Sequence, residues 1–118
     1  MSKEPVTRVE ASEEAVLIHI QRRSLDESST NELVDDVLGA AAEHPGPPIV
    51  LDMSQVRFAP SVALGSLVRL SKSFKLDNRR LILVGVDRRT RGAIAVTRLD
   101  KVLEIFNTLE DALKSSPN

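Results

Sequence analysis

The side chains that could carry out chemistry are few in this chain, and they are widely spaced. The absence of Cys excludes disulfides, thiolate metal sites and a cysteine nucleophile. His19 alternates with apolar residues of a strand-like run, and His44 stands at a predicted helix end, where it complements the helix dipole. Asp35 and Asp36 are adjacent, so on a helix their carboxylates point in different directions. None of these residues indicates a metal site.

Sequence motifs of enzymes are missing as well. The five glycines are scattered, and they form neither a dinucleotide-binding Gly-x-Gly-x-x-Gly nor a phosphate-binding loop that ends in Lys-Ser or Lys-Thr. There is also no Gly-x-Ser-x-Gly nucleophile turn. We therefore expect a protein that is not an enzyme, has no cofactor and works by binding a protein partner.

The charges offer one feature that needs an interpretation. The net charge of −1 gives no long-range attraction to nucleic acid. However, the stretch 79–101 concentrates basic side chains: Arg79, Arg80, Arg88, Arg89, Arg91, Arg98 and Lys101. They could form a patch for an acidic partner, a phosphate or RNA, or simply a solvated surface around a buried strand. Because few aromatic residues are available to stack on bases, the solvated surface is favoured and nucleic acid is not an expected partner.

Length and hydropathy predict a single domain over 1–118 with frayed tails at 1–5 and 115–118. The chain has 118 residues and 42% hydrophobic residues, enough for one core. Its first residues, MSKEPVTRVE, contain no apolar signal-peptide segment, and no apolar run approaches the ~18 residues of a membrane span. These features predict a cytoplasmic protein without a membrane span.

The hydrophobic pattern alternates between strand-like and helix-like segments. Strands are predicted at 6–9, 15–20, 49–53, 81–86 and 102–106. Ser29 or Thr30 is predicted to N-cap a first helix that ends at His44. Further helices are predicted from Ser61 to Asp77, from Thr90 to Arg98 and after a Thr108 cap. The order β-β-α-β-α-β-α-β-α indicates an α/β domain with a mixed sheet of four or five strands and about four helices. The predicted core contains Leu17, Leu33, Val50, Leu51, Leu64, Leu67, Ile82 and Val84.

The segment 49–65, IVLDMSQVRFAPSVALG, resembles the centre of STAS domains, the family of bacterial anti-sigma-factor antagonists. In that family a strand leads through a short loop into Asp-Ser-Ser/Thr-Gly-Leu-Gly, and the first Ser accepts a phosphate. Ser61 matches this phosphoacceptor, and Leu64 and Gly65 match the Leu-Gly. The resemblance extends over roughly 6–115 through Leu25-Asp26, the segment LDKVL at 99–103 and NTLEDAL at 107–113.

Four positions depart from the family pattern. Pro60 replaces the Asp before the phosphoacceptor, Val62 the second hydroxyl residue, and Ala63 the Gly that follows it. Arg98 stands where the family has Gly before its last short strand. These departures leave the predicted fold intact but bear on the phosphorylation switch.

The resemblance implies a protein that binds a serine-kinase anti-sigma factor. Phosphorylation of Ser61 would reverse this binding. The alternative is a STAS scaffold or an accessory subunit of a regulatory complex or transport system, without phosphorylation. We expect partner contacts at the carboxyl ends of the strands, where open α/β sheets bind ligands. The residues expected there are Leu25, Asp26, Arg57, Phe58, Ala59, Pro60, Ser61, Val62, Leu64 and Gly65.

Overall fold

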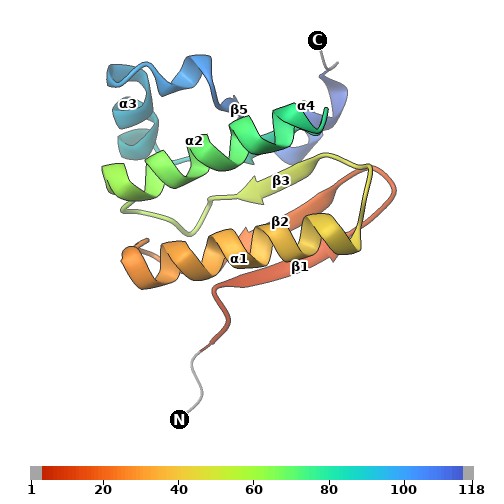
Figure 1. Ribbon diagram of the computed structural model, residues 1–118. Helices are drawn as coiled ribbons and strands as arrows, with labels where there is room; N and C mark the ends of the chain where they lie inside the picture. Colours follow the sequence, from red (N-terminus) through yellow and green to blue (C-terminus); the bar gives the residue numbers. More distant parts are fainter. Residues whose placement is uncertain (1–3, 116–118) are drawn as a thin grey trace.

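The computed structural model describes residues 4–115 (Figure 1). The predicted frayed tails fall largely on residues 1–3 and 116–118, outside this range. The described residues of these tails are hydrogen-bonded to the rest of the domain. The Pro5 carbonyl accepts from Gln21 Nε2 at 3.0 Å, and Ser115 Oγ accepts from Arg80 Nη2 at 2.8 Å.

The structure confirms the α/β class and the predicted order of elements. The strands are β1 (Thr7–Ala11), β2 (Val16–Ile20), β3 (Ile49–Asp52), β4 (Leu81–Val84) and β5 (Glu104–Phe106). The helices are α1 (Glu27–Glu43), α2 (Ser61–Leu76), α3 (Arg88–Val96) and α4 (Leu109–Lys114), with a 3₁₀ turn at Leu99–Lys101. Within residues 4–115 no helix combines the length and the apolar composition that crossing a bilayer requires.

The five strands form one mixed sheet in the order β1-β2-β3-β4-β5. Only β1 is antiparallel to its neighbour, whereas β2 to β5 run parallel to one another. Helices α1 and α2 lie together on one face of the sheet, and α4 lies on the other (Figure 1). Strands β3 and β4 are therefore buried on both faces, which is why their sequences are continuous apolar runs.

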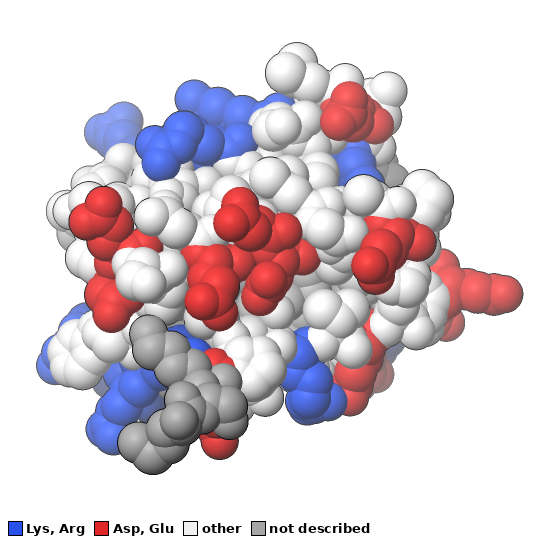
Figure 2. Space-filling model, turned by 60° about the horizontal axis from the view of Figure 1, so that its bottom comes forward, with Lys and Arg blue, Asp and Glu red and all other residues white. Residues whose placement is uncertain are grey.

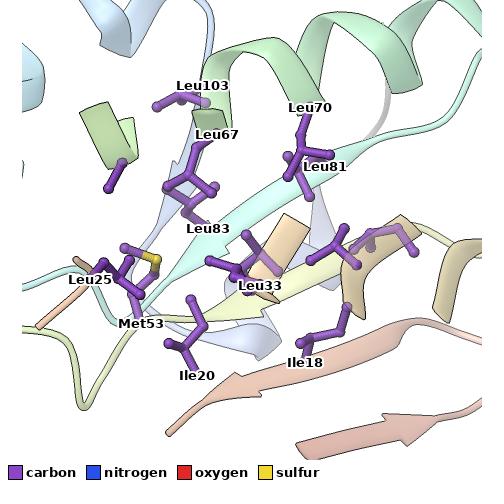
Figure 3. Packing of buried hydrophobic residues seen from close by; sticks show 14 of the residues in the cluster. Ile18, Ile20, Leu25, Leu33, Met53, Leu67, Leu70, Leu81, Leu83 and Leu103 are labelled. Atoms are coloured by element: carbon purple, nitrogen blue, oxygen red, sulfur yellow. The ribbon is translucent and has the colours of Figure 1, made fainter. Parts of the chain in front are cut away.

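The larger part of the core fills the space between the sheet and helices α1 and α2. Figure 3 shows Leu33 of α1 and Leu67 of α2 close to Ile18, Ile20 and Leu83 of the sheet. The predicted core residues are buried except Leu17. Leu17 is only half-buried because it lies on the other face, at the margin of the smaller cluster around α4.

Two helices begin earlier than predicted, each because an Asp caps it. The prediction that Ser29 or Thr30 caps the first helix was wrong, since both are buried inside α1 and Asp26 Oδ1 accepts the Ser29 N–H at 2.7 Å. Likewise α3 begins at Arg88 and not at Thr90, because Asp87 Oδ1 accepts the Thr90 N–H at 2.9 Å.

The predicted strands 81–86 and 102–106 are also shorter in the structure. The first ends at Val84, and the second begins at Glu104 because the chain from Leu99 to Lys101 turns as a 3₁₀ helix.

The turn before this 3₁₀ helix lies at one of the departures from the family pattern, Arg98. Arg98 adopts φ 60° and ψ 20°, the left-handed conformation in which a side chain with a Cβ is strained. Gly, the family residue at this position, would adopt the same conformation without a steric penalty. The fold therefore holds Arg98, a residue with a Cβ, in a left-handed turn.

Arg98→Gly is expected to stabilise the protein. The left-handed conformation costs a residue with a Cβ about 1–2 kcal/mol, whereas Gly loses about 0.5–1 kcal/mol more backbone entropy. We expect the free energy of unfolding in urea to rise by about 0.5–1 kcal/mol. Ala95→Gly on the exposed side of α3 is the control, and it should lower the free energy of unfolding by about 1 kcal/mol. If Arg98→Gly lowered the free energy of unfolding as much as the control does, Arg98 would not be strained in the wild type.

Candidate functional site

Two loops meet at the carboxyl ends of β2 and β3. The Arg23 carbonyl accepts the backbone N–H groups of Arg57 at 2.7 Å and Phe58 at 3.1 Å, and the Phe58 carbonyl accepts the Leu25 N–H at 3.0 Å. These bonds form a short parallel bridge between Ser24 and Phe58. The structure thus places Leu25 and Asp26 beside the loop 57–62, as the sequence predicts. The role of Asp26 in partner binding stays a prediction.

Two of the predicted contact residues have their side chains inside the protein. Leu25 is fully buried and Leu64 is 3% exposed. The expectation that they contact a partner is wrong for their side chains, because both pack in the core with Met53 and Val56 beneath the loop. They anchor the surface instead.

The exposed part of the site is apolar and rimmed by basic side chains. Phe58 is 49% exposed and Val62 is 67% exposed. The guanidinium of Arg89, from α3, lies 5.5 Å from the centroid of the Phe58 ring, in cation–π geometry. The side chains of Phe58, Arg89, Arg57 and Pro60 border a shallow depression of about 480 Å³. Of the other predicted residues, Ala59 and Gly65 are partly exposed.

Arg89 is the residue of this site that sequence reasoning missed. The Arg-rich stretch 79–101 was the available signal, but its members do different things in the structure. Arg79 donates to the carbonyls of Ala41 and Pro47 at the end of α1 and in the loop that follows, and Arg80 pairs with Glu104. The stretch is therefore partly structural, and only Arg89 reaches the apolar surface at Phe58.

Ser61 is the first residue of α2, and it is exposed. Pro60 precedes it as the N-cap residue and makes no side-chain capping bond, while its carbonyl accepts the Leu64 N–H at 3.1 Å. In the part of the chain that the structure describes, no side chain is hydrogen-bonded to the Ser61 hydroxyl. The N–H groups of the first helical turn have no acceptor within the helix, so this end of α2 favours an added negative charge.

A polar cluster supports the loop from the sheet. Asp52, at the end of β3, accepts the Ser54 N–H at 3.0 Å, and its Oδ2 lies 2.7 Å from His19 Nδ1. His19 Nε2 lies 3.3 Å from Glu10 Oε2, so each ring nitrogen of this strand residue faces a carboxylate oxygen. Between residues 4 and 115, no three His, Asp or Glu side chains form a group that could hold a metal ion.

Asp52 makes the loop sensitive to acid. Burial raises the pKa of its carboxyl, but the hydrogen bonds from Ser54 and His19 outweigh burial and hold the pKa below the ordinary value of 3.8. A carboxyl with a lowered folded-state pKa stabilises the fold above its unfolded-state pKa. This stabilisation is lost as the pH falls through the folded-state pKa.

Asp52→Asn should therefore destabilise the protein at pH 7, and this destabilisation relative to the wild type should disappear in acid. We expect a loss of about 1–3 kcal/mol at pH 7, because the amide cannot replace both bonds of the carboxylate. The difference from wild type should shrink as the pH falls below 3.8. Urea unfolding at several pH values measures it. Asp35→Asn, at an exposed position on α1, serves as the control. An equal loss at every pH would show that the carboxylate charge is not responsible.

Comparisons with known proteins find relatives of this chain and of its fold. A family model described as the STAS domain matches residues 7–112. A candidate anti-sigma factor antagonist of Thermotoga neapolitana, the TM1081 homologue, is 30% identical over 66 residues, which are 56% of this chain. The match spans only 58% of that relative's length.

Solved structures share the fold over most of the chain. An anti-sigma-factor antagonist (STAS) domain protein from Planctomyces limnophilus is 24% identical with a TM-score of 0.76, and the match covers 91% of this chain and 93% of that one. The anti-sigma factor antagonist SpoIIAA in its unphosphorylated form is 18% identical with a TM-score of 0.72, over 91% and 92% of the two chains. SpoIIAA of Bacillus has also been solved in its phosphorylated form, with a TM-score of 0.67, 18% identity and coverage of 91% and 96%.

Proposed function

Since this chain belongs to the STAS domain family, we propose that it is an anti-sigma-factor antagonist that binds a serine-kinase anti-sigma factor. The names of the similar proteins support this role. The observation that carries the proposal is the exposed surface of Phe58, Ser61 and Val62, which the Ser24–Phe58 bridge holds in place. In this role the chain acts in the cytoplasm as one domain, and it needs no metal, cofactor or catalytic residue of its own.

The surface suits a protein partner better than a small molecule. Phe58 on the fixed loop and Val62 in the first turn of α2 are both exposed, and apolar side chains at the centre of an interface contribute most of its binding energy. Arg57 and Arg89 stand at the rim, where charges steer association and select partners. The depression is shallow and open, so it would cover only one side of a bound small molecule.

Ser61 is positioned to act as a switch on this surface. A phosphate on its hydroxyl adds about 1.5–2 negative charges, which the N–H groups of the first turn of α2 stabilise. Because the family's Asp is Pro60 here, no side chain competes for these groups. The added charge would disfavour a partner surface shaped around a neutral hydroxyl next to Phe58 and Val62.

Pro60 also supports a second function, that of a scaffold or an accessory subunit without a switch. Its ring has no N–H and carries no carboxylate, so a kinase that reads the family's Asp would dock poorly. Such a protein would keep the same surface and bind its partner at all times. Phosphorylation of Ser61 distinguishes the two functions.

The binding surface is tested by charge reversal. Arg57→Glu is expected to weaken the affinity for the partner at least tenfold, because it places a carboxylate at the rim of the interface. Lys114→Glu, on α4 at the other face of the sheet, makes the same change in charge and should leave affinity unchanged. Titration calorimetry with the anti-sigma factor captured from the native lysate provides the measurement. If Lys114→Glu weakens binding and Arg57→Glu does not, the surface is misplaced.

The switch is tested at Ser61 itself. Incubation with the captured kinase and ATP should add one phosphate to the wild type and none to Ser61→Ala, as read by mass spectrometry. Ser61→Asp should weaken partner binding, whereas Ser61→Ala should bind and resist inactivation. Ser73→Asp, farther along the exposed side of α2, is the matched control and should bind normally. No mass shift on the wild type, or the same shift on Ser61→Ala, would exclude the switch and favour the scaffold.

A further inference from the structure

The outer edge of the sheet is formed by β1, whose free side meets no other strand within residues 4–115. The pairing with β2 fixes which backbone groups are free. The Val6 carbonyl accepts from Gln21, and the Ser12 N–H donates to Ala15, so the even-numbered residues bond to β2. The N–H and carbonyl groups of Thr7, Val9 and Ala11 therefore point outward. Such an edge is a template for a further strand.

We propose that β1 pairs antiparallel with β1 of a second copy of this chain, with Val9 of each copy opposite the other. In this register the outward groups of Thr7, Val9 and Ala11 meet those of Ala11, Val9 and Thr7 of the second copy. The two sheets then join into one continuous sheet. Val9, which is 40% exposed in the single chain, is covered by its counterpart.

The charges on β1 favour this register over the neighbouring ones. Arg8 and Glu10 flank Val9 on the face of the sheet opposite α1, and each side chain is 55% exposed. With Val9 at the centre, Arg8 of each copy stands opposite Glu10 of the other. These are the non-hydrogen-bonded pairs, in which opposite side chains come closest. A register centred on Arg8 or on Glu10 would instead oppose two like charges.

Arg8 and Glu10 already form an ion pair within one copy of β1. Their side chains are therefore long enough to pair across two neighbouring strands. Arg8 Nη1 lies 2.6 Å from Glu10 Oε1 in the single chain. Because both side chains are exposed, they can exchange this contact for one across the dyad at little cost. His19 Nε2 remains 3.3 Å from Glu10 Oε2 on the same face.

The other face of β1 sets a limit on the affinity. There β1 and α1 border a groove of about 710 Å³ that includes Val9 and the carboxylates of Asp35, Asp36 and Glu43. Figure 2 shows acidic side chains gathered across this side of the molecule. In the proposed pair the two α1 helices lie on the same face, separated by both copies of β1. Their mutual repulsion is reduced at about 0.15 M salt, where the screening length is ~8 Å.

The test uses two charge-reversal variants, one at Arg8 and one at Glu10, whose charges complement each other. Arg8→Glu leaves only acidic charges at the two positions and Glu10→Arg only basic ones, so each variant should self-associate about tenfold more weakly than the wild type. An equimolar mixture of the two variants should form a heterodimer, since every cross-strand pair is then attractive. Sedimentation velocity gives the affinities, and native mass spectrometry identifies the heterodimer. Circular dichroism confirms that both variants are folded.

A further variant probes the backbone. Val9→Pro removes an outward N–H and leaves the hydrogen bonds between β1 and β2 in place, so it should abolish self-association of a folded chain. A wild type that remains monomeric at the highest attainable concentration would overturn the proposal. So would variants that dimerise as well alone as in the mixture. Binding of the anti-sigma factor and phosphorylation of Ser61 are separate measurements, so either proposal can fail alone.

Discussion

The backbone pairing of residues 23–25 with 57–58 is the constraint on which the candidate site depends. Strands β2 and β3 are parallel neighbours, so the loops that leave them start side by side. The bonds around Ser24 and Phe58 convert this adjacency into a fixed surface. Leu25 secures it from below, because its fully buried side chain makes the loop part of the core.

This arrangement separates the residues that hold the surface from those that are displayed on it. Leu25, Met53 and Leu64 are buried under the loop, and the neighbouring Phe58 and Val62 are exposed. Apolar exposure of this kind gives the isolated domain no stability, which is why it is typical of a surface that a partner covers. An exposed cation–π contact such as that of Arg89 contributes only about 0.5–1 kcal/mol, so its effect is to orient Phe58.

Much of the fold could be predicted because it follows from local patterns. The runs at β3 and β4 are apolar at every position, which is typical of strands buried on both faces. Pro60 and Ser61 mark the start of α2 correctly. The cap of α1 was misplaced by three or four residues and the start of α3 by two, because Ser29, Thr30 and Thr90 are also good capping residues. Only the backbone geometry shows that an Asp ahead of each of them is the cap.

The sequence by itself determined the order of the elements, the strands of the core and the place of Ser61 at a helix start, since each depends on neighbouring residues along the chain. The tertiary structure decided which loop side chains are buried, that Arg89 of α3 faces Phe58, and which backbone groups of β1 point outward. These features depend on contacts between segments far apart in the sequence. No local pattern contains them, because packing and strand register are set only when the whole sheet is assembled.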